Sequence, residues 1–168
     1  MPKIIENLET KLIEAAGEQL AQSGYGALTI RSVASSVGVG VGTVYNYFPS
    51  KDALVAGYLL REWNVCLNAI QEISNSSESP EDVLRCIHSQ LWDYFRRHRM
   101  IFQDRDAAPA YAASMGRYHS MLRSQIASPL RKFCSSDFSA EFIAEAMLTW
   151  TVGGKAFSDI YGMIRKLF

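Results

Sequence analysis

The apolar residues of this chain recur at intervals of three and four positions along nearly its whole length. In the first segment they fall at Leu8, Leu12, Ala16 and Leu20, which is the spacing of one face of an α-helix. Almost no segment alternates apolar and polar residues as a half-buried strand does. The pattern therefore predicts an all-α protein whose first helix stops near Gly24.

Length and composition indicate a globular chain. Its 168 residues are 48% hydrophobic and 20% charged, and the formal net charge is zero, which argues against disorder and against a polybasic tail. Any binding of nucleic acid must then depend on a local patch of charge. The acidic residues near the start and the short apolar runs argue against a secretory signal and a membrane span. We therefore expect a cytoplasmic protein.

The helical pattern divides the chain into a small N-terminal part and a larger C-terminal part. We expect a small helical domain over residues 1–50 and a larger helical domain over residues 51–168. Capping residues such as Thr29 and Ser50, and glycines or prolines between the segments, mark the expected helices. Their ranges are about 30–37, 51–73, 80–95, 99–105, 110–133 with a kink at Pro129, 139–152 and 155–168.

Residues 37–51 form a glycine-rich stretch, VGVGVGTVYNYFPSK. A phosphate-binding P-loop requires a preceding strand and the pattern G-x-x-x-x-G-K-[ST], but here Gly42 is followed by Thr43 and no strand pattern precedes it. The spacing G-x-G-x-G also differs from the dinucleotide fingerprint G-x-G-x-x-G. We therefore interpret the glycines as the turn and the first residues of a short helix.

A helix-turn-helix over residues 29–48 explains this stretch and the residues before it. Thr29 is a suitable N-cap for the first helix, and Gly38 stands where the turn needs a positive φ. Gly40 can start the second helix, whose inner face then includes Val44 and Phe48. The pattern predicts a second helix that is largely exposed on its other face.

The residues on that exposed face suit a DNA groove. They include Gly42, Thr43, Asn46 and Tyr47, with Tyr45 at the flank. Hydroxyl and amide groups can bond to phosphates or base edges, and glycine lets the backbone approach closely.

The run LTIRSVASSVGVGVGTVYNYFPSKDAL resembles the DNA-binding domain of the TetR family of bacterial transcriptional regulators. The family signature is a helix-turn-helix that ends in Tyr-x-Tyr/His-Phe and is followed by Ser-Lys-Glu/Asp-x-Leu. Tyr45, Tyr47 and Phe48 match its first part, and SKDAL at residues 50–54 matches the second. The similarity covers about residues 5–60.

The resemblance implies a homodimeric, all-helical repressor that binds operator DNA and is released by a small molecule. It also implies roles for particular residues. Phosphate contacts are expected from Thr29, Tyr45, Tyr47 and Lys51, and base-edge contacts from Arg31, Thr43 and Asn46, with Gly42 clearing the approach. A helical protein-interaction module without DNA binding and, less favoured, a small all-helical enzyme remain alternatives.

Aromatic and methionine residues in the C-terminal part are candidates for a pocket that binds a small apolar or aromatic effector, although for each residue alone a core position is favoured. The candidates are Trp63, Cys66, His88, Trp92, Phe95, Tyr111, Met115, Tyr118, Leu122 and Trp150. The last two expected helices are too apolar for ordinary surface helices, which favours a dimer interface there. The candidates for this interface are Phe142, Met147, Trp150, Phe157, Ile160, Tyr161 and Ile164.

The remaining reactive side chains predict no catalytic or metal site and no cofactor. Cys66, Cys86 and Cys134 lack the spacing of a zinc site or a disulfide framework. The three histidines lack metal-ligand spacing. The chain is short for the family it resembles, which leaves open a reduced dimer interface or a C-terminus beyond Phe168.

Overall fold

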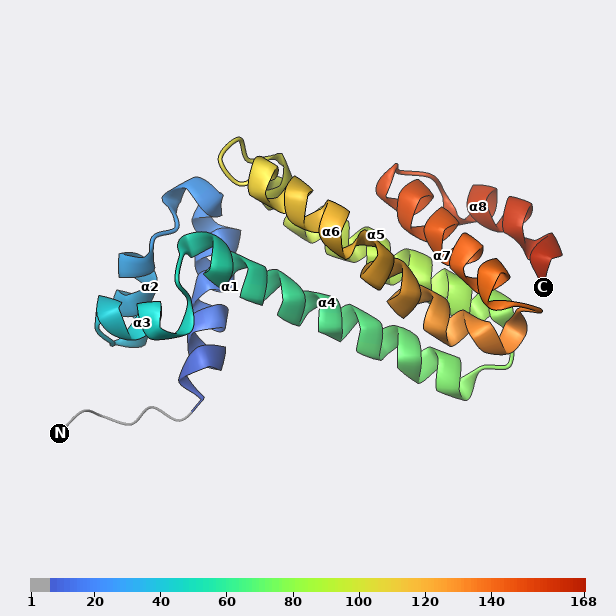
Figure 1. The fold of residues 1–168 in the computed structure, drawn as a ribbon, viewed down its shortest axis with the longest axis horizontal. Coiled ribbons are helices and arrows are strands. Elements are labelled where there is room, and N and C mark those ends of the chain that lie inside the picture. The colour runs from blue at the N-terminus through green and yellow to red at the C-terminus, as the bar shows by residue number, and fades with distance from the viewer. Residues whose placement is uncertain (1–6) are drawn as a thin grey trace. The chain divides into compact units, whose positions relative to one another are not determined.

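The computed structural model describes residues 7–168, and the side chains of all of these except residues 108–117. Every regular element in this range is helical, so the predicted all-α fold is confirmed (Figure 1). The helices are α1 (Leu8–Ala27), α2 (Ile30–Val37), α3 (Val41–Tyr47), α4 (Lys51–Ser76), α5 (Pro80–Gln103), α6 (Ala108–Ala127), η1 (Ser128–Phe133), α7 (Asp137–Val152), α8 (Phe157–Ile164) and η2 (Arg165–Leu167).

The chain forms two compact units. The first contains residues up to Glu62 together with Met100–Ala112, and the second contains Trp63–Arg99 together with Ala113–Phe168. Helix α4 therefore begins in the first unit and ends in the second. A domain boundary at residue 50 stays a prediction.

The core of the first unit holds α2 and α3 against α1 and the start of α4. Leu12, Val33, Val44 and Leu54, one from each of these helices, have no exposed surface. Helix α1 approaches α4 closely at Gly17, where a Cβ atom would lie 2.5 Å from Cε2 of Tyr58. The core therefore fixes the two short helices to a longer scaffold.

The core of the second unit contains residues of α4, α5, the end of α6 and α7. Leu84, Ile87 and Leu91 line one face of α5 and are fully buried, as are Ile126 and Ile143. Figure 1 shows α7 and α8 as consecutive helices with a short turn between them. This turn uses Gly153 and Gly154, and the latter has a φ of 80°.

Helix α5 is longer than the sequence pattern predicts. The separate short helix expected over residues 99–105 does not form, because α5 continues without interruption to Gln103. No proline or glycine stands between Phe95 and Gln103 to stop it. The kink expected at Pro129 is a change of helix type, since α6 ends at Ala127 and the 3-10 helix η1 follows.

Helix α1 extends past Gly24, where the sequence predicts its end. The backbone of α1 is non-helical at Gly24, with a φ of 75°, although the helix resumes to Ala27. Across residues 7–168, no helix is both long enough and apolar enough to cross a membrane.

Candidate nucleic-acid interface

Thr29 begins α2 and fixes the position of its first turn. Its Oγ1 accepts from the backbone N–H of Ser32 at 3.0 Å, and Ser32 Oγ lies 3.1 Å from the Thr29 backbone N–H in return. Ser32 Oγ is also within 2.6 Å of Gln19 Oε1 on α1. The predicted N-cap is confirmed, and it ties α2 to the long helix beneath it.

The turn between α2 and α3 is built as its sequence predicts. Gly38 adopts a left-handed conformation with φ 76° and ψ 36°, which is costly for residues with a Cβ atom. The N–H of Val39 then donates to the carbonyl of Ala34 at 2.9 Å, and Val39 packs partly buried against the core. Gly40 is the N-cap of α3.

Helix α3 buries one face and exposes the other. Val44 is fully buried, whereas Tyr45 and Tyr47 are 51% and 47% exposed, and Gly42 and Asn46 are exposed as well. Thr43 is partly exposed. The side chains predicted to face DNA therefore lie on the accessible surface of this helix.

The start of α4 adds a capped helix end and a positioned cation. Ser50 Oγ accepts from the N–H of Ala53 at 3.0 Å. Lys51 places its Nζ 3.8 Å from the centre of the Tyr25 ring, which is the geometry of a cation–π contact. The Tyr25 hydroxyl donates to the carboxylate of Asp52.

Burial, and next the hydrogen bond to Asp52, raise the pKa of the Tyr25 hydroxyl. Tyr25 therefore stays protonated and continues to donate to Asp52 at neutral pH. Its side chain is only 6% exposed, so the ring is a rigid support for Lys51. Sequence reasoning did not include Tyr25, because its position beside Lys51 depends on how α1 packs on α4.

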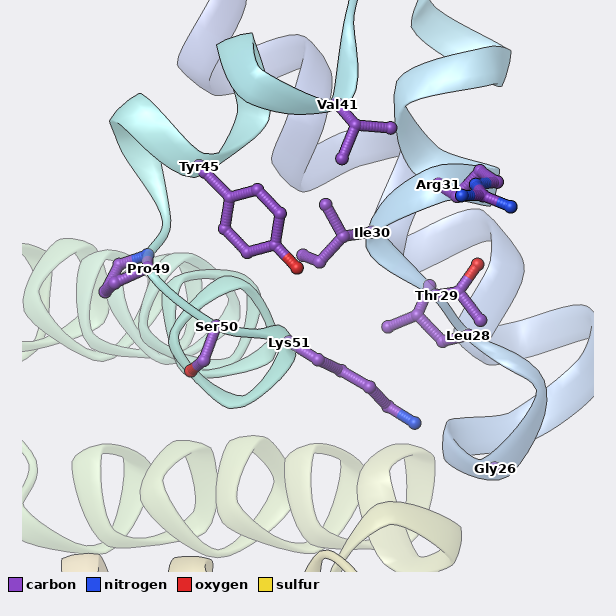
Figure 2. Close-up of a pocket in the computed structure, with 10 residues that line it drawn as sticks. All are labelled: Gly26, Leu28, Thr29, Ile30, Arg31, Val41, Tyr45, Pro49, Ser50 and Lys51. Carbon is purple, nitrogen blue, oxygen red and sulfur yellow. The ribbon is translucent and has the colours of Figure 1, made fainter.

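These elements surround an open cleft of about 560 Å³, which Figure 2 shows in close-up. Thr29 and Arg31 line it at the start of α2, Ser50 and Lys51 line it at the start of α4, and Tyr45 comes from α3. None of the ten lining residues is acidic. Two helix N-termini and two cations therefore make the cleft attractive to an anion such as a phosphate.

The candidates for the effector pocket do not lie together in the second unit. Trp63, Cys66 and Leu122 are buried, and Trp63 Nε1 donates to Gln125 Oε1 at 2.9 Å. Phe95 is partly buried. Of the other candidates, Trp92, Tyr118 and Trp150 are exposed, and the side chains of Tyr111 and Met115 lie outside the described residues.

Trp92 was expected on the buried face of its helix, and this expectation is wrong, because its side chain is 43% exposed. His88 was a possible polar contact for which a surface position was favoured, and it is partly exposed next to Trp92. Their rings stack on each other with a centroid distance of 6.5 Å, and His88 also meets the edge of Phe157 on α8 at 5.8 Å. The His88 Nε2 lies 3.0 Å from the carbonyl oxygen of Lys155. His88 therefore links α5 to α8. Trp92 is exposed because the buried face of α5 contains Leu91 and Tyr94, and Trp92 lies outside this face.

Two residues that sequence reasoning missed continue the buried face of α5. Tyr94 is 6% exposed and His98 is 2% exposed. Tyr94 meets Trp63 edge-to-face at 5.4 Å and His98 at 4.7 Å. Their spacing after Leu91, three and then four positions, is the signal that identifies them once α5 is known to continue.

Burial in this interior lowers the pKa of His98 to about 4, with Arg97 as a smaller second cause. His98 is therefore neutral at neutral pH.

Burial raises the pKa of the Cys66 thiol to about 12. It also raises the pKa values of the Cys86 and Cys134 thiols. All three cysteines are free thiols. Within the described residues, no group of three or more His, Cys, Asp or Glu side chains is placed to hold a metal ion.

The candidates for the dimer interface divide by burial. Met147, Ile160 and Ile164 are buried inside the protomer, at 0%, 5% and 4% exposure, so their inclusion in an exposed interface is wrong. They supply the inner face of α7 and α8 instead. Phe142 and Trp150 are more than half exposed. Phe157 and Tyr161 are partly exposed and stack on each other at 5.3 Å.

Comparison with known proteins places the N-terminal region in a family. Residues 12–58 match the family model described as bacterial regulatory proteins, tetR family. Over 91 residues, 54% of this chain, it is 29% identical to the uncharacterized HTH-type transcriptional regulator YuxN of Bacillus subtilis. Over 53 residues, 32% of this chain, it is 40% identical to the HTH-type transcriptional repressor KstR of Rhodococcus jostii. The matches span 31% and 25% of those relatives' lengths.

Solved structures extend the likeness to the whole fold. A transcriptional regulator from Cytophaga hutchinsonii superposes with a TM-score of 0.66 at 22% identity, covering 97% of this chain and 93% of that one. Thermus thermophilus FadR, a TetR-family transcriptional repressor crystallised with lauroyl-CoA, has a TM-score of 0.63 at 20% identity and coverages of 95% and 92%. At such identities the likeness shows the fold alone. The match to the tetR family model is confined to residues 12–58, which contain the helix-turn-helix.

Proposed function

We propose that this protein is a transcriptional regulator that binds operator DNA as a homodimer and is released by a small-molecule effector. The observation that carries the proposal is the surface formed by the exposed side of α3 and the adjacent acid-free cleft. This surface lies within the region that matches the TetR family model.

In this proposal α3 enters the major groove and the cleft receives a backbone phosphate. Lys51 and the hydroxyls of Tyr45 and Tyr47 contact phosphates, which fixes the register of the protein on the duplex. Thr29, whose hydroxyl caps α2, lines the cleft that receives a phosphate. Arg31, Thr43 and Asn46 reach base edges, and Gly42 lets the backbone of α3 come close.

The match of residues 12–58 to the tetR family model favours a regulator over the alternatives. The family consists of transcriptional regulators rather than enzymes. A helical interaction module would not need the acid-free cleft between two helix N-termini. We therefore assign the first unit to DNA and place the protein in the cytoplasm, where bacterial DNA is accessible to it.

Binding to duplex DNA at low salt tests this function directly. Wild-type protein should bind random-sequence duplex, and Lys51→Ala should weaken that binding because it removes a phosphate contact. Lys155→Ala is the matched control, since Lys155 is an exposed lysine between α7 and α8. Absence of any duplex affinity in the wild type, or equal effects of the two lysine variants, would argue against the proposal.

The proposed dimer uses the exposed apolar residues of α7 together with the outer side of α8. Phe138 and Phe142 are 78% and 53% exposed, Trp150 is 51% exposed, and Met163 on α8 is 80% exposed. Exposed apolar surface of this kind is typical of an interface between subunits. Phe142→Glu should shift the sedimenting species from dimer to monomer, whereas a wild-type monomer at micromolar concentration would rule the interface out.

The proposed effector is a small apolar or aromatic molecule bound inside the second unit near Trp63 and Tyr94. These rings and Cys66 supply an apolar lining, and Gln125 supplies a polar group. Lauroyl-CoA, present in the Thermus thermophilus FadR structure, is a suitable first probe. An effector of this class should release bound duplex from the wild type and should raise its melting temperature. Compounds that change neither measurement are not effectors.

A further inference from the structure

The outer face of α3 carries only uncharged groups. Gly42, Tyr45, Asn46 and Tyr47 are exposed, and Thr43 is partly exposed. The sequence of the helix, VGTVYNY, contains no Lys, Arg, Asp, Glu or Gln. The polar groups that α3 can offer to a base edge are therefore one amide, one aliphatic hydroxyl and two phenols.

Thr43 and Asn46 have their polar groups available, unlike the polar residues at the start of α2. The hydroxyls of Thr29 and Ser32 are engaged in the cap and with Gln19. No hydrogen-bond partner for the side chain of Thr43 or Asn46 exists among the residues whose side chains are described. The two residues are three positions apart, so they share a face with their Cβ atoms about 5–6 Å apart.

Each base edge in the major groove has a preferred side-chain partner. Arg and Lys pair with guanine, Asn and Gln pair bidentately with adenine, and the methyl of Thr packs on the methyl of thymine. Helix α3 therefore has a partner for adenine and one for thymine, but none for guanine. The cations that line the cleft are outside α3, with Arg31 on α2 and Lys51 at the start of α4.

We propose that the operator base pairs facing Thr43 and Asn46 are A·T pairs. Asn46 accepts from the N6 amino group of adenine and donates to its N7, while the Thr43 methyl lies against the 5-methyl group of a nearby thymine. The inference rests on the proposed function, in which α3 lies in the major groove. A separation of about 5–6 Å between the two Cβ atoms fits bases one or two steps apart, at about 3.4 Å a step.

Selection of bound duplex from a random library, by the wild type and by Asn46→Ala, tests this assignment. Wild-type sites should share an A·T pair in each half-site, and Asn46→Ala should lose the preference at that pair only. The substitution should also weaken binding to the wild-type site about 5- to 150-fold, the equivalent of one bidentate base contact, with little effect on random duplex. Asn68→Ala is the matched control, because Asn68 is an exposed asparagine on α4 in the other unit; it should select the wild-type site.

Base analogues in the selected duplex locate the two contacts. Replacing the adenine by 7-deazaadenine should weaken the wild type and leave Asn46→Ala unaffected, because the N7 acceptor is gone. Replacing the thymine by uracil should weaken the wild type and leave Thr43→Ser unaffected, because each change removes one of the two methyl groups in contact.

Two results would overturn the inference while leaving the proposed function intact. One is a G·C pair at the position whose preference depends on Asn46. The other is a selected sequence that stays the same in Asn46→Ala and Thr43→Ser. A wild-type protein that binds no duplex would instead contradict the proposed function itself.

Discussion

Tyr25 connects the core of the first unit to the cation in the cleft. Its ring lies under the Lys51 ammonium, and its hydroxyl donates to Asp52, the next residue of α4. A lysine side chain has many rotamers in solution, so a ring that favours one of them lowers the entropy lost on binding a phosphate. Tyr25 is thus a positioning residue in the proposed DNA contact.

Tyr25→Leu should weaken duplex binding about 2- to 5-fold, because it removes a cation–π contact of about 0.5–1 kcal/mol. Tyr25→Phe retains the ring and should keep most of the affinity, although it loses the hydrogen bond to Asp52 and about 1 kcal/mol of stability. Duplex titrations in wild-type and Lys51→Ala backgrounds measure the coupling. If Tyr25→Leu weakens binding equally in both backgrounds, Tyr25 does not act through Lys51.

His98 makes the stability of the second unit sensitive to acid. Its pKa in the folded protein is about 4, compared with 6.5 for an ordinary histidine. Between these values the unfolded chain takes up a proton that the folded chain does not, so stability is complete above about pH 6.5 and falls as the pH is lowered towards 4.

The expected loss between about pH 7.5 and about pH 4.5 is about 2.5 kcal/mol from this residue alone. His98→Leu should remove this part of the pH dependence while leaving the contributions of the carboxylates. Urea unfolding of both proteins at the two pH values gives the difference. Parallel pH profiles for the two proteins would mean that His98 does not titrate as described.

Two glycines inside helices differ in the space around them. A Cβ atom at Gly17 in α1 would lie 2.5 Å from the ring of Tyr58, whereas a Cβ atom at Gly42 in α3 would meet nothing within 4 Å. Close packing against Tyr58 therefore explains why position 17 is a glycine. Nothing inside the protein requires Gly42, although glycine in a helix costs up to about 1 kcal/mol relative to alanine.

The same substitution should consequently have opposite effects at the two sites. Gly17→Ala should lower the free energy of unfolding by about 1–3 kcal/mol through overpacking, and Gly42→Ala should raise it by up to about 1 kcal/mol. Gly42→Ala should nevertheless weaken duplex binding, because the added methyl group stands between α3 and the groove. Thermal melting and duplex titration separate the effects. A Gly42→Ala protein that is more stable and binds equally well would show that no close approach occurs there.

Charge determines how the whole molecule should respond to salt. The chain has zero formal net charge, and Arg31 and Lys51 are the cations that line the cleft. A dimer would then bring two Lys51 side chains to phosphates and two Arg31 side chains into the groove beside them. The slope in a plot of log K against log salt concentration should therefore lie between about −2 and −4.

Titrations from about 50 to 200 mM salt measure this slope. Lys51→Ala in both protomers should reduce its magnitude by about 2, since one phosphate contact per protomer is lost. Lys155→Ala should leave it unchanged. A wild-type slope near −10, as a strongly electrostatic repressor shows, would contradict the small number of cations assigned to the interface.

Local signals in the sequence predicted the elements around the DNA-binding surface. Thr29, Gly38 and Ser50 each act within three residues of their own position, as an N-cap, a left-handed turn residue and an N-cap. Such interactions depend on nearby backbone groups, so a sequence is enough to identify them. The periodicity of apolar residues was likewise sufficient for the all-helical fold, and the motif at residues 45–54 was sufficient to predict the match of residues 12–58 to the tetR family model.

Long-range packing decided the rest. The sequence alone placed Trp92 inside, but α5 continues to Gln103 and turns Tyr94 and His98 inward instead. It also could not show that Tyr25 supports Lys51, or that Met147 faces the core while Phe142 faces outward. A helix pattern defines a stripe of apolar residues, yet it does not say which neighbour covers each part of that stripe. Only the packed helices settle this, because burial is a property of the neighbours as much as of the residue itself.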